Sequence, residues 1–158
     1  MVVFGVTNSV PVVGLPGYPA SASITSELFV KSMIREFTGE IFDDGDFVLA
    51  KLARKIHSPM GDEEFLRVTV GRIDNAYVAT PTARGAAMTL AMSRSDGIVR
   101  ISADSEGVDE GEEIKVALVR PRHLIDKTVI VSGSHDIALD VLGSKFSELP
   151  GSAKMVSS

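Results

Sequence analysis

Two short apolar runs open the chain. Residues 2–6 and 10–14 are almost wholly apolar, and Thr7-Asn8-Ser9 between them is a group that favours a turn. We predict two short strands joined by this turn, the second of them buried on both faces.

A helix is predicted after a turn rich in glycine and proline. From Ile24 to Phe37, apolar residues recur at mostly helical spacing, with Ser21 or a neighbour as the N-cap and Gly39 as the stop. One strand and one helix have no second layer to bury their apolar faces against. We therefore interpret this segment as a fragment of an α/β domain.

From residue 43 the apolar pattern changes to a period of two. Alternate apolar residues share one face in each of two predicted strands: Leu66, Val68 and Val70 in the first, and Ile114, Val116 and Leu118 in the second. Further strands are predicted at residues 76–80 and 98–101, a short helix at 86–93, and turns at 43–45, 61–62 and 110–111. The pattern predicts a small antiparallel β-barrel or sandwich.

The C-terminal residues again combine a strand with a helix. Residues 128–132 are apolar, residues 133–136 favour a turn, and residues 136–146 have helical spacing with Asp136 as the cap. The expected fold class is therefore α+β in several pieces: a strand-helix fragment of an α/β domain, a small antiparallel β-barrel and a C-terminal strand-helix segment. We place these pieces at residues 1–42, 43–122 and 123–158, and expect the chain to begin inside one α/β domain and end inside another.

Composition excludes several function classes. The net charge of -5 comes without a basic run, which argues against a nucleic-acid partner. With no cysteine there is no thiolate nucleophile or thiolate metal site, and only His57, His123 and His135 supply imidazole. The charge-free residues 1–26 are interrupted by prolines and glycines, so neither a membrane span nor a signal peptide is predicted. We expect a cytoplasmic protein.

The turn Gly14-Leu15-Pro16-Gly17-Tyr18-Pro19 is the candidate functional centre. In open α/β sheets, ligands bind where a strand ends and a helix begins, and a helix N-terminus attracts anions. Gly14 and Gly17 would let the backbone approach a ligand, Pro16 and Pro19 would hold the loop in one shape, and Ser21 adds a hydroxyl. These residues alone support a rigid connection capped by Ser21 equally well. The aromatic ring of Tyr18 is expected to be exposed, for stacking on a ligand or packing at an interface.

Two other motifs are interpreted as structural. Ser134-His135-Asp136 contains the residue types of a catalytic triad, but adjacent side chains on a tight turn cannot stack in relay order, so a helix cap is favoured. The acidic groups at residues 43–46, 62–64 and 109–113 lack the ligand spacing of a calcium loop and are interpreted as solvated turns. No metal ligand is assigned.

Three segments resemble one known family. Residues 12–22, VVGLPGYPASA, look like the GLPGNPVSA-type signature of the molybdopterin molybdotransferases, the MoeA family, which is related to the E domain of gephyrin. Tyr18 stands where Asn is usual, and Ala20 where Val is usual. Residues 84–87, 96–99 and 110–116 resemble the family's C-terminal β-barrel domain in order and spacing. Residues 128–142 are similar to the opening of the periplasmic-binding-protein-like domain that follows the barrel in archaeal members.

The resemblance implies an enzyme that inserts molybdate into adenylylated molybdopterin, releasing AMP, with Mg²⁺ assistance. The family's two signature prolines lie at its active site, which assigns a catalytic role to Pro16 and Pro19 and a cofactor-binding role to Gly14, Gly17 and Ser21. The implied partners are adenylylated molybdopterin, molybdate and a second copy of the chain, because the family's site is shared across a homodimer; no nucleic acid or membrane is implied. The family's acidic catalytic residues and main pterin-binding loop precede the matched segments, so this chain is expected to be a C-terminal part of the enzyme.

Two alternatives remain open. In the first, the chain is a non-catalytic module that binds an oxyanion or molybdopterin or serves as a scaffold, as gephyrin's related domain anchors a receptor. In the second, Met1 marks a truncated reading frame whose product is inactive. The choice between molybdate and tungstate is also open.

Overall fold

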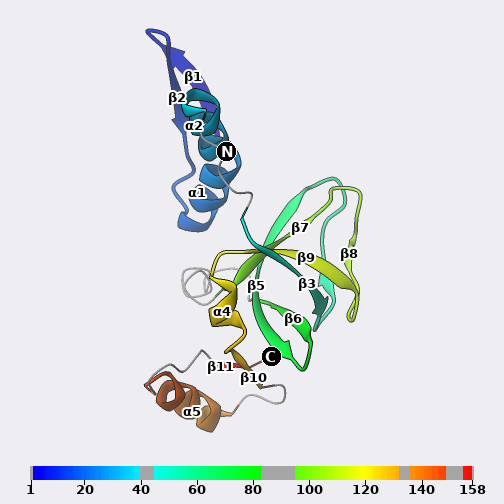
Figure 1. The fold of residues 1–158 in the computed structure, drawn as a ribbon. Helices are drawn as coiled ribbons and strands as arrows, with labels where there is room; N and C mark the ends of the chain where they lie inside the picture. The colour runs from blue at the N-terminus through cyan, green and yellow to red at the C-terminus, as the bar shows by residue number, and fades with distance from the viewer. Residues whose placement is uncertain (1, 40–44, 83–94, 132–135, 149–154, 158) are drawn as a thin grey trace.

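The computed structural model describes residues 2–39, 45–82, 95–131, 136–148 and 155–157. Along the chain, a hairpin and a helix come first, a closed β-barrel follows, and a strand and a helix come last (Figure 1). The predicted mixture of helix and sheet with a small barrel is confirmed. The predicted helix at 86–93 and most of the predicted turns at 43–45 and 133–136 lie outside the described residues, and the boundaries of the three pieces stay predictions.

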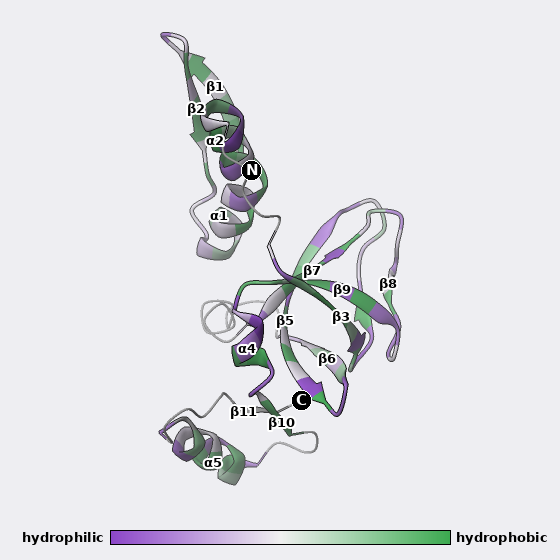
Figure 2. Cartoon of the chain, viewed as in Figure 1, coloured by the Kyte–Doolittle hydropathy of each residue, from purple (hydrophilic) through white to green (hydrophobic). Residues whose placement is uncertain are grey.

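The N-terminal hairpin consists of β1 (Val3–Thr7) and β2 (Val10–Gly14), which pair antiparallel. Asn8 and Ser9 have φ angles of 49° and 66°, as expected in a tight hairpin turn, so both predicted strands are confirmed. The expected burial of the second strand is wrong. Figure 2 shows apolar residues along both strands. Val10 is 57% exposed, because this sheet has only two strands and leaves most of their apolar side chains open to solvent.

One continuous helix follows, made of α1 (Pro19–Thr25), the π-helical turn η1 (Ser26–Val30) and α2 (Lys31–Thr38). It ends at Gly39, whose φ of 68° is left-handed, and this confirms the predicted stop. The N-cap is Tyr18 and not Ser21. Pro19 takes the first helical position, where its missing N–H has no intrahelical role, and this places Ser21 inside the first turn.

The barrel is a closed ring of five strands: β3 (Phe47–Leu52), β6 (Ala76–Pro81), β5 (Glu64–Ile73), β7 (Gly97–Ile101) and β9 (Glu113–Leu118), in that order, with β9 pairing back to β3. The expectation of a wholly antiparallel barrel is wrong, since β3 and β6 run parallel. Directions cannot alternate around a closed ring with an odd number of strands. A separate ribbon of β4 (Ile56–His57) and β8 (Gly107–Val108) accompanies the ring.

The core of the barrel follows the predicted alternation. Leu66, Val68 and Val70 of β5 are buried, as are Ile114 and Val116 of β9. The ring is tight enough that a Cβ at Gly97 would lie 2.4 Å from Val116 Cγ1 and 2.8 Å from the carbonyl oxygen of Ala117. Inward side chains therefore pack closely in the ring around Gly97.

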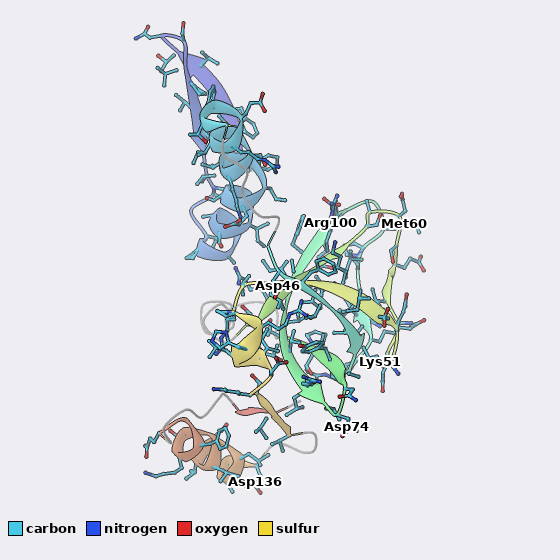
Figure 3. All side chains as sticks on the ribbon, in the orientation of Figure 1. Asp46, Lys51, Met60, Asp74, Arg100 and Asp136 are labelled. Carbon is cyan, nitrogen blue, oxygen red and sulfur yellow. The ribbon has the colours of Figure 1, made fainter. Side chains whose placement is uncertain are left out.

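The segment after β9 packs on the barrel through α4 (Arg122–Ile125) and β10 (Val129–Val131). Arg122, the first residue of α4, makes two hydrogen bonds to the carboxylate of Asp46, 2.5 and 2.9 Å long. Figure 3 labels Asp46 beside this helix. The Tyr77 hydroxyl donates to Asp126 Oδ1 at 2.8 Å. Ile125 is 0% exposed and belongs to the barrel core.

The last elements are α5 (Ile137–Ser147) and β11 (Met155–Ser157), which pairs parallel with β10. Asp136 caps α5, since its carboxylate accepts a hydrogen bond of 2.7 Å from the N–H of Ala138, and the predicted cap is confirmed. In the described ranges, every helix is too short or too polar to cross a membrane.

Candidate functional site

The predicted loop links β2 to the helix and is open to solvent. Tyr18 is 80% exposed, which confirms the expected exposed ring. A Cβ at Gly17 would have no atom within 4 Å, so a ligand can approach the backbone there. Gly14 is closer to its surroundings, since a Cβ there would lie 3.5 Å from Val3 Cβ.

The first helical turn carries the remaining predicted site residues. Ala22 N donates to the carbonyl oxygen of Tyr18 at 2.8 Å, and this is the first bond of the helix. Pro19 has no N–H, and the N–H groups of Ala20 and Ser21 have no acceptor one turn earlier. The five residues Gly14, Pro16, Gly17, Pro19 and Ser21 thus lie together in one loop and helix start, while their roles stay predictions.

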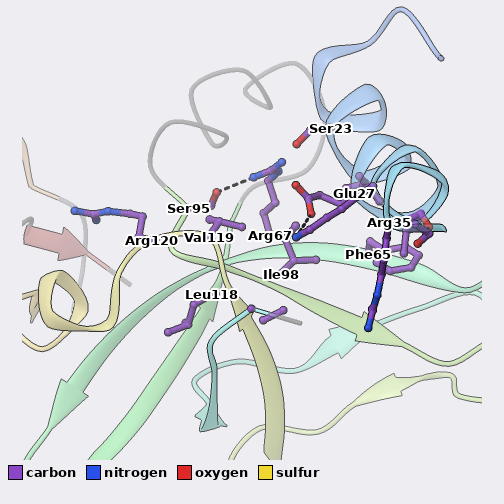
Figure 4. A pocket seen from close by; sticks show the side chains of 16 residues that line it. Ser23, Glu27, Arg35, Phe65, Arg67, Ser95, Ile98, Leu118, Val119 and Arg120 are labelled. Carbon is purple, nitrogen blue, oxygen red and sulfur yellow. Dashed lines mark hydrogen bonds and ion pairs between the residues drawn. The ribbon is translucent and has the colours of Figure 1, made fainter. Parts of the chain in front are cut away.

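A pocket of about 790 Å³ separates the helix from the outer face of the barrel (Figure 4). One wall is the helix segment from Ser23 to Arg35, and the other consists of outward side chains of β5, β7 and the end of β9. The five predicted site residues are not among those that line it.

The pocket has an excess of positive charge although the chain is acidic. Among the described residues, Lys31, Arg35, Arg67 and Arg120 line it, with Glu27 as the acidic neighbour. Glu27 is paired with Lys31 at 3.1 Å, and Arg120 with Asp96 at 2.7 Å, which leaves Arg67 as the arginine of interest. A concave surface lined by cations attracts anions.

Not all hydrogen-bond donors of Arg67, which lines this pocket, have an acceptor. Its Nη1 donates to Ser95 Oγ at 3.1 Å, and its Nε is buried without a hydrogen-bond partner. Figure 4 shows the guanidinium pointing away from the barrel toward the segment that carries Ser23 and Glu27. Burial lowers the pKa of Arg67, yet a guanidinium stays protonated at neutral pH. A half-buried cation that lines a pocket and has no carboxylate partner among the described residues is suited to bind an oxyanion.

Arg120 is engaged differently. Its Nη1 lies 2.7 Å from Asp96 Oδ1, and the carboxylate of Asp96 is fully buried. In Figure 4 the side chain of Arg120 extends on the far side of Ser95 from Arg67. The positive charge of Arg120 therefore neutralises the buried carboxylate of Asp96 and is less available to a ligand in the pocket.

Sequence patterns did not identify Arg67. It occupies an outward position in a strand whose alternate residues are apolar, where a solvated arginine is ordinary. What distinguishes it is that no carboxylate of the described residues pairs with it, which depends on the neighbouring strands and helix. The alternation could show at most that Arg67 points outward.

A metal centre is not formed by the described part of the chain. It contains no group of three or more His, Cys, Asp or Glu side chains that could hold a metal ion. His57 and His123 lie within the described ranges, whereas His135 lies outside them.

Comparisons with known proteins agree on one group. Residues 49–119 match the model of the family described as MoeA C-terminal region (domain IV). A Methanocaldococcus jannaschii protein, whose name assigns it to molybdopterin biosynthesis, is 29% identical over 117 residues, which are 74% of this chain and 26% of that protein.

Two solved structures from archaea are also similar. A molybdopterin biosynthesis MoeA protein from Pyrococcus horikoshii has a TM-score of 0.61 and 30% identity, and covers 76% of this chain and 29% of its own. A molybdenum cofactor biosynthesis protein from Pyrococcus furiosus has a TM-score of 0.57 and 28% identity, and covers 73% of this chain and 40% of its own. The chain thus spans less than half the length of each relative.

Proposed function

We propose that this chain, whose residues 49–119 are a MoeA C-terminal region (domain IV) homologous to archaeal molybdopterin biosynthesis proteins, works in molybdenum cofactor biosynthesis. More specifically, it serves as a C-terminal part of a molybdotransferase that inserts molybdate into adenylylated molybdopterin. The names of the relatives support the pathway, and the sequence signature in residues 12–22 supports the reaction.

The observation that carries this proposal is the Arg67 guanidinium. Molybdate is a tetrahedral dianion, and Arg67 presents to it, in a concave pocket, a guanidinium that donates to the neutral Ser95 and has no carboxylate partner among the described residues. Hydrogen bonds between a guanidinium and an oxyanion are among the strong ones in proteins, because both groups are charged. The role of Arg67 is to hold the anion in a fixed orientation out of bulk water.

The loop from Gly14 to Ser21 is the second anion-binding element of the proposal. Its exposed backbone and the first N–H groups of the helix favour negative charge, as phosphate groups of a nucleotide or pterin carry. These residues are not among those that line the pocket of Arg67. A homodimer, with the loop of one copy facing Arg67 of the other, would complete the site, and light scattering of the purified chain tests that state.

The family resemblance also implies a magnesium ion. The described residues do not fit Mg²⁺, because they offer no group of three or more carboxylate or imidazole side chains. In this proposal the described residues bind and orient anionic groups, and they supply no ligand set for the metal.

We expect the replacement Arg67→Ala to weaken molybdate binding by about tenfold or more, since a lost charge-assisted hydrogen bond is worth roughly 1.5–3 kcal/mol. Isothermal titration of the full chain with sodium molybdate measures this. Arg54→Ala is the matched control, because Arg54 is an exposed arginine of a different, smaller pocket. Unchanged affinity in Arg67→Ala would contradict the oxyanion role, and the absence of binding to the unaltered chain would contradict the proposal for this polypeptide.

The replacements Pro16→Ala and Pro19→Ala are expected to weaken binding of an adenylylated pterin nucleotide while the melting temperature falls only slightly. Loss of a proline that already fits its loop costs about 0.4–1 kcal/mol through the unfolded state. Calorimetry and thermal unfolding separate the two effects, with Pro59→Ala in an exposed loop as the control. A large loss of melting temperature with unaltered affinity would show a rigid connection instead. Binding of molybdate alone, with no cofactor formed in a complementation assay, would favour the non-catalytic module.

A further inference from the structure

Two neighbouring residues, Ser95 and Asp96, each accept a hydrogen bond from a different arginine. Ser95 is 2% exposed and its Oγ accepts from Arg67 Nη1 at 3.1 Å. Asp96 Oδ1 accepts from Arg120 Nη1 at 2.7 Å. One dipeptide just before β7 therefore anchors both guanidinium groups from the barrel wall.

Asp96 of this dipeptide is fixed by three further bonds, two through its backbone and one through its side chain. The N–H of Asp96 donates to the carbonyl oxygen of Val68 at 2.9 Å, and the carbonyl oxygen of Asp96 accepts from Val119 N at 2.9 Å. Asp96 Oδ2 also accepts from Val70 N at 2.9 Å. These bonds tie residue 96 to β5 on one side and to the end of β9 on the other, so Ser95 Oγ is held at a set place beside Arg67.

That placement decides which donors of Arg67 remain available. The guanidinium is planar and rigid, so fixing Nη1 to Ser95 restricts the rotation of the whole group. With Nη1 held by Ser95 and Nε buried, the remaining end of the guanidinium is the part that can face an anion in the pocket. An arginine held in this way loses less rotational freedom when an anion binds than a mobile arginine would.

We propose that Ser95 is a positioning residue for the oxyanion site, acting through Arg67 and not by contact with the anion. This rests on the proposed function of Arg67 described above. The ordinary alternative is that Ser95 only satisfies a nearby donor and stabilises the barrel.

The test is a double-mutant cycle on the full chain, with molybdate as the probe. Ser95→Ala is expected to weaken molybdate binding by about three- to tenfold, and Ser95→Ala combined with Arg67→Ala to bind no more weakly than Arg67→Ala alone. Ser95→Thr, which keeps the hydroxyl, should bind more tightly than Ser95→Ala. Thermal unfolding of each variant verifies that the barrel is folded.

The outcomes distinguish the two proposals. If Arg67→Ala has no effect on binding, the oxyanion role of Arg67 fails and the positioning role fails with it. If Arg67→Ala weakens binding while Ser95→Ala binds as the unaltered chain does, only the positioning role is overturned. Additive losses in the double variant, or a lower melting temperature with unaltered affinity in Ser95→Ala, would equally overturn it.

Discussion

Replacing Asp96 with alanine is expected to lower the free energy of unfolding by about 3–5 kcal/mol, because removing one partner of a buried ion pair leaves the other uncompensated. The carboxylate is fully buried and accepts hydrogen bonds from Arg120 and from the N–H of Val70. Alanine would leave that buried N–H without an acceptor and free the side chain of Arg120. Urea unfolding followed by circular dichroism measures the change.

The control for this variant is Asp104→Ala. Asp104 is an exposed aspartate of a turn on the same barrel, and its replacement should change stability by no more than about 0.5 kcal/mol. An equally small effect in Asp96→Ala would show that Asp96 is not needed to join β5 to the segment after β9. Asp96→Asn, which retains one acceptor oxygen, should lie between the alanine variant and the unaltered chain.

Replacing Ile125 with alanine is expected to destabilise the barrel by about 2–4 kcal/mol, the usual cost of a cavity left by a buried isoleucine. Ile125 lies in α4, beyond the residues that match the family model, yet it is fully buried in the same core cluster as the barrel strands. The transition midpoint of β-sheet unfolding in urea is the measurement.

Ile137→Ala provides the comparison for that variant. Ile137 begins α5 and is 77% exposed, so its truncation should change barrel stability little. If Ile125→Ala were equally mild, α4 would be a loosely attached extension, and residues 120–131 would not be part of the cooperative unit.

The sequence pattern predicted the barrel strands well because burial alternates residue by residue in β9 and in the first half of β5. In β5 and β9 the side chains that face inward are the apolar ones, and a period of two follows from the pleat itself. Helix and hairpin ends were predicted for a similar local reason: Gly39 adopts a left-handed φ, and Asn8-Ser9 accepts positive φ in a tight turn. These features depend on a few adjacent residues.

Other features depend on residues far apart in the chain. The parallel pairing of β3 with β6 follows from ring closure, which the alternation of a single strand cannot express. The exposure of β2 depends on what lies beside it, whereas its apolar composition indicated only that burial would be favourable. The lack of a carboxylate partner for Arg67 among the described residues likewise depends on a serine, Ser95 just before β7, lying beside its guanidinium.

Ring closure also sets an order of events during synthesis. β9 pairs with β3 on one side, where Ala50 lies opposite Ile114, and with β7 on the other. Until β9 emerges from the ribosome, the nascent sheet has two open edges, at β3 and at β7, each able to pair with a foreign strand. When β9, a strand of six residues, pairs with both β3 and β7, it removes both open edges at once. The pairing of β9 with β3 closes a long stretch of chain, and this step is slow because the chain loses entropy before the contacts form.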